Sequence, residues 1–366
     1  MSVIETYQNA DNLENDPSSI AEQSVGESAE TPRKKQIRAT TTWHNRVQEQ
    51  KYRRSLVDWV SAFDLGPPEL YEPLADKIDR GPVPYHPVWR ENLFILKFML
   101  VPLVAQWALL TFTGIKLESA IAIGIQYTAY QIWFVTFAIH TVLRAHRFMG
   151  EYGTLNEHKR GRDIVPDVHY KRLHYALMIF IFVRNIGVFV LGKDRALKPS
   201  LSLWSPVKVG LFQIALDYFF YFYHRSTHEF DSLWFIHRQH HATKSPTPFM
   251  SLWADDYQDM IEWIIVPFLA YLVVNLTFAE LYVASGYTLY VEAMGHSGIR
   301  AYWLHPLLGK VLQPFGMELA IEDHDLHHRH GRGGKNYGKQ SRVWDVLFGT
   351  CAPREEEGIY ASSKGQ

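Results

Sequence analysis

The chain has 366 residues, a formal net charge of −1 and a single cysteine, Cys351. One cysteine excludes internal disulfides, cysteine-ligated iron–sulfur clusters and zinc fingers, so any metal must be held by nitrogen and oxygen ligands. The nearly balanced charge gives no indication of nucleic-acid binding, whereas the aromatic content of 14% is high for a soluble enzyme.

The first 92 residues divide into two segments of opposite charge. Residues 1–32 contain acidic side chains, no lysine or arginine and few large apolar residues, a composition that predicts a disordered acidic tail. Residues 33–92 begin with a basic run, continue with apolar residues at helical spacing and end in a proline-rich stretch. We expect an interfacial amphipathic segment, or equally a solvated surface helix, followed by a semi-rigid connector.

Four long apolar blocks follow, at residues 93–113, 120–142, 175–191 and 209–223. A bilayer is crossed by roughly 20 residues of helix, so the first two blocks are long enough and the other two need flanking residues. The sequence therefore predicts an all-α integral membrane protein with about four transmembrane helices, rather than a soluble helical core. We assign residues 93–202 to a segment that contains the first transmembrane helices.

The topology and the later apolar region are predicted less directly. Basic residues in the N-terminal segment and in the link after the second block favour a cytosolic location for both. Four crossings then return the chain to the cytosol near His224. A further apolar region, residues 260–294, is compatible with a hairpin that dips into the membrane or with two helices packed over the histidines that flank it.

Nine histidines provide the strongest chemical signal. Eight of them fall into three clusters with i, i+3 or i+4 spacing, which places each cluster on one face of a helix. Nine imidazoles are enough ligands for two metal ions, and imidazole suits iron, zinc, copper and nickel. We therefore predict a dimetal site in a helical cap at the cytosolic rim. The predicted metal ligands are His224 and His228; His237, His240 and His241; His296; and His324, His327 and His328.

Acidic residues near these clusters are candidates for orienting the imidazoles. Asp217 lies two turns before His224 and is a charge inside an apolar block, where ionisable groups are costly and by default functional. We predict that it holds the second N–H of a ligand imidazole, with an ion pair to Arg184 as the alternative. Glu322, Asp323 and Asp325 are weaker candidates and are expected to be solvated.

No catalytic residue beyond the metal ligands is predicted. Seven of the other histidines lie outside the three clusters, and a lone histidine is more often structural than a ligand. Those seven are His140, His146, His158, His169, His174, His305 and His330.

Several motifs together resemble the fatty acid hydroxylase/sterol desaturase superfamily. They are DYFFYFYHRSTH, HRQHH, GHSG, HDLHH, NYG and WDVLFGT, which occur in this order within residues 203–350. The resemblance implies a membrane-bound di-iron oxygenase of the endoplasmic reticulum that uses dioxygen and two non-heme irons held by the nine histidines. It also implies electrons from cytochrome b5 and an NAD(P)H reductase. No HPGG heme motif occurs in this sequence, so the electron donor would be a separate protein. After the region that carries these motifs, residues 351–366 are predicted to form a C-terminal tail.

The sequence leaves the substrate and the exact reaction open. The resemblance is compatible with sterol, fatty acyl, sphingoid or terpenoid-like lipids, and with hydroxylation, desaturation or oxidative demethylation. Two other classes remain as alternatives: a zinc-dependent membrane hydrolase and a non-enzymatic metal-binding or transport protein. A hydrolase would favour a glutamate inside the histidine motif, as in HExxH, and the apolar blocks offer few polar residues for a transport path.

Overall fold

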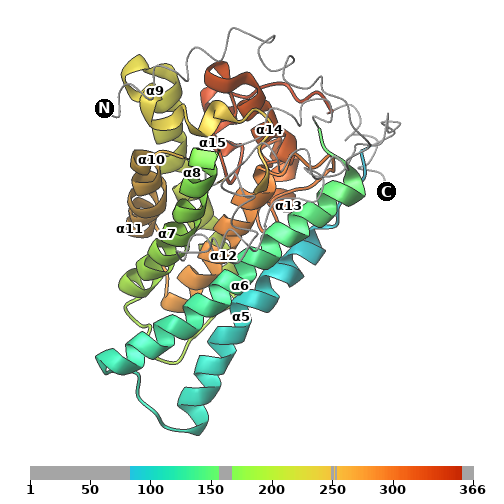
Figure 1. Cartoon of the computed structure of the whole chain (residues 1–366). Helices are drawn as coiled ribbons and strands as arrows, with labels where there is room; N and C mark the ends of the chain where they lie inside the picture. Colours follow the sequence, from blue (N-terminus) through green and yellow to red (C-terminus); the bar gives the residue numbers. More distant parts are fainter. Residues whose placement is uncertain (1–82, 156–166, 249–250, 252–253, 357–366) are drawn as a thin grey trace, which may run out of the picture.

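The computed structural model describes residues 83–155, 167–248, 251 and 254–356 (Figure 1). The predicted acidic tail and most of the predicted connector lie outside the described residues. Within the described ranges the chain forms helices joined by loops, and its only β-type pairings are two isolated bridges, Tyr85 with Tyr302 and Thr154 with Ile299. The predicted all-α class is therefore confirmed.

Four long helices contain the four predicted apolar blocks: α5 (Val88–Phe112), α6 (Ala120–Tyr152), α7 (Asp167–Leu191) and α8 (Ser205–Glu229). Among the helices that the structure describes, α5 alone is long and apolar enough to cross a membrane by length and composition. Only 28% of its most apolar stretch is buried within the protein, so most of it faces outward. The four-span topology stays a prediction.

Helix α12 (Phe278–Gly295) forms the centre of the bundle and contacts α5, α6, α7 and α8 (Figure 1). It begins with a capping box, in which Thr277 and Glu280 satisfy each other's backbone N–H groups. All its residues are buried. At Gly286 an added Cβ would lie 2.3 Å from Sδ of Met99, so the absence of a side chain there lets α5 pack closely against α12.

The predicted apolar region of residues 260–294 forms two helical arms joined by a loop, as both of its predicted arrangements require. The helix α10 (Asp256–Met260) continues through a π-helical turn, η7 (Ile261–Ile265), into α11 (Val266–Val273), which packs against α8. After a short loop the chain returns as α12. Side chains of α11 such as Leu272 remain exposed, whereas those of α12 are buried, so the two halves of this region have different surroundings.

Shorter elements gather at one end of the long helices, around the C-terminal end of α8 (Figure 1). Three of them carry predicted ligands: α9 (Asp231–His237), η5 (His240–Ala242) and α14 (Ile321–His330). The rest of the C-terminal part of the described chain surrounds these three. It contains α13 (Gly309–Leu312), η8 (Gln313–Phe315), η9 (Gly331–Gly333) and α15 (Val343–Phe348).

Candidate metal centre

The structure brings all nine predicted histidines together in two neighbouring groups. Each ring in a group offers one nitrogen that lies within 4.8 Å of the nitrogens offered by all the other rings of that group, and every member is buried. We call these the first and second histidine groups. The first contains His224, His228, His237, His241 and His327, and the second contains His240, His296, His324 and His328.

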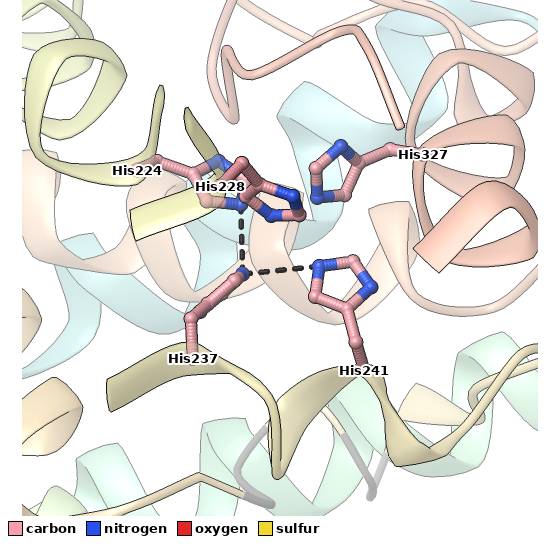
Figure 2. A group of neighbouring side chains, drawn as sticks. All are labelled: His224, His228, His237, His241 and His327. Carbon is pink, nitrogen blue, oxygen red and sulfur yellow. Dashed lines mark hydrogen bonds between the residues drawn. The ribbon is translucent and has the colours of Figure 1, made fainter. Parts of the chain in front are cut away.

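The first histidine group is assembled from three segments whose rings point toward one another (Figure 2). Two of its members come from the last turns of α8, two from α9 and η5, and His327 from α14. The Nε2 atom of His237 lies 2.8 Å from Nε2 of His224 and 3.1 Å from Nε2 of His241. Residues far apart in the sequence thus present the same ring nitrogen to one small volume.

Backbone carbonyls fix the orientation of the rings from outside. Nδ1 of His224 donates to the carbonyl of Tyr337 at 2.8 Å, and Nδ1 of His327 donates to that of Lys335 at 2.8 Å. Nδ1 of His228 donates to a backbone carbonyl of η9 at 3.0 Å. His237 uses a side chain instead, because its Nδ1 donates to Oε1 of Gln258 at 2.8 Å. These partners assign the proton to Nδ1 and leave an unprotonated lone pair on Nε2.

The second histidine group follows the same principle. Nδ1 of His296, at the end of α12, donates to the carbonyl of Glu292 at 2.7 Å, and Nδ1 of His328 donates to that of Thr243 at 3.2 Å. Nε2 of His296 lies 2.9 Å from Nε2 of His324 and 3.2 Å from Nε2 of His240. The isolated histidine of the sequence therefore completes a group whose other members belong to the repeated motifs.

This arrangement suits a bound cation. Unprotonated nitrogens that face each other repel, and the Nε2 atoms of His228, His327 and His328 are buried with no hydrogen-bond partner among the described residues. A metal–imidazole bond is about 2.1 Å long, so two ligands at right angles would be separated by roughly 3.0 Å. The observed separations of 2.8–3.2 Å bracket this value. The donor set therefore fits metal ions held by nitrogen.

Burial keeps the imidazoles in the neutral form that binds metal. Desolvation lowers the pKa of His228 to about 4 and that of His328 to about 3. The pKa values of His240, His324 and His327 also lie well below the usual range, because burial and then the neighbouring imidazoles disfavour protonation. At neutral pH the rings do not need to lose protons before they bind an ion.

The predicted hydrogen bond from Asp217 to an imidazole is wrong. Its Oδ1 accepts from the backbone N–H of Lys339 at 2.7 Å and of Gln340 at 2.9 Å, and its Oδ2 accepts from the N–H and the hydroxyl of Ser341 at 3.1 and 2.6 Å. The alternative, a pair with Arg184, is also not formed, because Arg184 pairs with Glu292 at 3.6 Å. Asp217 therefore anchors the loop that follows Tyr337. Backbone carbonyls, rather than Asp217, accept the second N–H of most of the imidazoles.

The acidic residues around His324 are buried rather than solvated, which corrects a second expectation. Asp323 accepts from the backbone N–H of Ala320 and pairs with Arg354 at 2.7 Å. Glu322 accepts from two backbone N–H groups after Arg354, and Asp325 pairs with Arg329 at 2.6 Å. Residues 354–356 thus stabilise the position of α14. The sequence could not predict this role, because these partners lie some 30 residues after the acidic side chains.

The histidines predicted to be structural stay outside both groups wherever the structure describes them. His305 accepts the backbone N–H groups of Leu307 and Leu308, each at 3.1 Å. His140 and His330 each donate to the carbonyl one helical turn earlier, and His146 is buried in α6. His158 and the side chains of His169 and His174 lie outside the described part of the chain.

The part of the chain that contains these histidines is similar to known proteins. Residues 209–350, which contain all nine histidines, match the fatty acid hydroxylase family. The chain is 37% identical to the fatty acid hydroxylase vlmA of Lecanicillium sp over 228 residues, which cover 58% of this chain and 62% of that protein. It is 30% identical to alkylglycerol monooxygenase of Danio rerio over 151 residues, or 40% of this chain and 31% of that protein.

Human alkylglycerol monooxygenase is 26% identical over 200 residues, which cover 54% of this chain and 40% of the human protein. The chain thus spans less than two thirds of the length of each of these relatives. No solved structure matches the chain significantly.

Proposed function

Because this chain belongs to the fatty acid hydroxylase superfamily, we propose that it is a membrane-bound, non-heme di-iron oxygenase that modifies a lipid with dioxygen. One observation carries the proposal: nine buried, neutral imidazoles form two groups of close ring nitrogens, and in six of the rings a hydrogen bond from Nδ1 leaves Nε2 unprotonated. The first histidine group would hold one ion and the second group the other. All nine histidines, and no carboxylate, are proposed as ligands.

Iron bound there would supply the redox chemistry needed to attack an unactivated C–H bond, which zinc does not provide. The contribution of the chain is to fix the ligands and exclude water. Carbonyls of Tyr337, Lys335 and Glu292 hold the Nδ1 protons, so that Nε2 is available on each of these rings. Complete burial of His237, His327 and His328 keeps bulk water away from the reacting centre.

The reaction is proposed to be hydroxylation, desaturation or oxidative demethylation. The names of the relatives, a fatty acid hydroxylase and alkylglycerol monooxygenases, favour hydroxylation among the three. Sterol, sphingoid and terpenoid-like lipids remain substrate candidates beside fatty acyl chains.

We further propose that the protein crosses the endoplasmic reticulum membrane about four times and that its metal centre faces the cytosol. Large apolar side chains remain exposed along the outward faces of the long helices, including Ile121 and Ile125 of α6 and Val190 of α7, each about two-thirds exposed or more. A row of this kind favours contact with lipid over contact with water. Electrons would come from cytochrome b5 and an NAD(P)H reductase on the cytosolic side.

The direct test is elemental analysis of the detergent-purified protein together with an assay of oxygen uptake after reduction. We expect about two irons per chain, one for each histidine group, and oxygen uptake. Zinc alone with no uptake, even after anaerobic reconstitution with iron, would contradict the proposal and favour a zinc hydrolase or a non-enzymatic metal-binding protein.

Single substitutions in each group test the ligand assignment. His327→Ala removes a ligand from the first histidine group and His240→Ala removes one from the second. Each is expected to lower the iron content and abolish turnover. His330→Ala is the matched control, because His330 lies on the same helix as His327 but outside both histidine groups, and its Nδ1 donates to the carbonyl of Leu326. Retained turnover with either ligand variant would contradict the assignment.

A further inference from the structure

One imidazole of the first histidine group is held differently from the others. Of the six Nδ1 hydrogen bonds described above, five end on backbone carbonyls, whereas that of His237 ends on Oε1 of Gln258 at 2.8 Å. Both side chains of this pair are buried. Because Nε2 of His237 lies close to Nε2 of both His224 and His241, the position of the proton on this ring affects the centre of the group.

A glutamine is an ambiguous partner for a metal-binding imidazole. A backbone carbonyl can only accept a hydrogen bond, so it fixes the proton on Nδ1 by itself. A glutamine amide has an accepting oxygen and a donating nitrogen, and these exchange places when the amide turns over. With its nitrogen toward His237, the ring would have to accept at Nδ1 and carry its proton on Nε2, which would then have no lone pair for a metal ion. Gln258 therefore supports metal binding in only one of its two orientations.

The Glu262 carboxylate selects that orientation. Glu262 lies four residues after Gln258, so the two side chains share one helical face, and the carboxylate accepts a hydrogen bond from the Gln258 amide. An ionised carboxylate has no proton to donate, so the amide nitrogen must face Glu262 and the amide oxygen must face His237. Glu262 also lies in the π-helical turn η7, a local geometry that occurs frequently at functional sites.

The carboxylate is in turn held by a buried cation. Nζ of Lys339 lies 2.9 Å from the Glu262 carboxylate and 3.3 Å from that of Glu292, which also pairs with Arg184 at 3.6 Å. All four side chains are at least nine-tenths buried. Two cations and two carboxylates balance, so Glu262 can be buried in its ionised form. The direction of each hydrogen bond from this ammonium group to the imidazole is therefore fixed.

We propose that Gln258 is a positioning residue for the metal centre: held by Glu262, its amide oxygen binds the Nδ1 proton of His237 and keeps Nε2 of that ring available to one of the two metal ions. The inference deepens the proposed metal-binding function and rests on it. It also predicts that the two histidine groups respond differently to substitutions here, because backbone carbonyls hold the Nδ1 protons of His296 and His328 in the second group.

The test measures the affinity of the full-length protein in detergent for Fe(II), by anaerobic competition with a chelator. The unaltered protein is expected to bind two ions. Gln258→Leu should weaken the binding of one ion about 10–100-fold, the usual effect of losing the partner of a ligand histidine, and leave the other unchanged. Gln239→Leu is the matched control, because Gln239 lies two residues after His237 but donates to the carbonyl of Ala254 at 3.2 Å. It should change neither affinity.

An exchange of two side chains separates hydrogen-bond direction from packing, and it keeps the test valid if Gln258→Leu does not fold. Gln258→Glu combined with Glu262→Gln preserves the total charge and places a carboxylate, which can only accept, directly against Nδ1 of His237. The amide at position 262 can accept from Lys339 and donate to that carboxylate. Glu262→Gln alone releases the amide of Gln258 and should weaken the binding of one ion, whereas the exchange should restore it.

Three outcomes would overturn the proposal. They are unchanged affinity for both ions in Gln258→Leu, an equal loss at both ions, and an exchange variant that binds no better than Glu262→Gln alone. Iron content and oxygen uptake of the unaltered protein report separately on the oxygenase assignment. If the unaltered protein bound zinc but not iron, that assignment would fail, and the same competition with Zn(II) would still test the role of Gln258.

Discussion

The two histidine groups lie next to a second buried polar cluster, which we call the ion cluster and which consists of Arg184, Glu262, Glu292 and Lys339. The two kinds of cluster offset the cost of burial in opposite ways. The ion cluster balances its own charges, because Lys339 pairs with two glutamates and one of these pairs with Arg184. The histidines are neutral, and unprotonated Nε2 atoms face each other in the pair of His224 and His237. The charges of the ion cluster are balanced within the chain, whereas the facing histidine nitrogens become favourable around a cation. This difference is the one expected between a structural cluster and the proposed metal-binding one.

The largest effect on stability is expected from acidification, because it favours protonation of the buried histidines. A histidine in an unfolded chain has a pKa of about 6.5, but burial lowers that of His228 to about 4 and that of His328 to about 3. As the pH falls below 6.5, the unfolded chain binds protons that the native groups do not, so stability decreases. The loss continues until the pH reaches the native values of about 4 and 3.

We expect the thermal midpoint of metal-free protein to fall steeply between pH 7 and pH 5, since each histidine kept neutral at pH 5 costs up to about 2 kcal/mol. For protein loaded with iron, the thermal midpoint should begin to fall only at a lower pH, because protons must first displace the metal. A midpoint of the metal-free protein that is constant over this range would show that the histidines are not buried in the neutral form.

Lys339→Met should break the ion cluster and cost about 3–5 kcal/mol of stability. The variant leaves two buried carboxylates facing each other with only Arg184 to balance them, and thermal unfolding in detergent measures the loss. Lys198→Met is the matched control, because Lys198 is exposed. Adding Glu262→Gln to Lys339→Met should recover part of the stability. If Lys339→Met alone had no effect, the cluster would be hydrated rather than closed by its own pairs.

The same contrast explains how much of the site could be predicted from the sequence. Spacings of three and four residues report which side chains share a helical face, so the histidine clusters can be recognised from the sequence alone. The four members of the ion cluster come from α7, η7, α12 and the loop after Gly338, and no local pattern connects them. The partners of Asp217 could not be predicted for the same reason, because they lie more than 120 residues later in the chain.

The fold shows a similar limit. Apolar blocks predicted the four long helices and the all-α class, because long runs of apolar residues are a local property. They could not predict that α12 would be buried along its whole length while α11 keeps an exposed face, since that outcome depends on which helices surround each one. The carbonyl partners of the histidines were missed for the same reason, as backbone groups leave no signature in the sequence.

Asp217→Ala tests the loop that connects the ion cluster with the first histidine group. The variant should lower the free energy of unfolding by about 2–4 kcal/mol, because three backbone N–H groups and one hydroxyl lose their common acceptor. The loop includes Lys339 of the ion cluster and follows Tyr337, whose carbonyl holds His224. We therefore expect lower thermal stability together with a partial loss of iron. Asp217→Asn keeps one acceptor oxygen and should be milder. Full iron content in Asp217→Ala would show that Tyr337 is held by other contacts, such as its own bond to Asp345.

The smallest effect is expected at the edge of the first histidine group. Asp231 pairs with Arg332, whose carbonyl accepts from Nδ1 of His228, but the Asp231 side chain is 91% exposed. Exposed ion pairs contribute about 0–1 kcal/mol, so Asp231→Ala should leave the thermal midpoint within about 2 °C and the iron content unchanged. The carbonyl of Arg332 stays in place without Asp231, because the N–H of Gly334 donates to the carbonyl of Gly331 across η9 and Nε of Arg332 donates to the carbonyl of His228. A loss of iron in Asp231→Ala would instead mean that the exposed pair holds the turn in place, and that the carbonyls around the histidines are less rigid than their burial suggests.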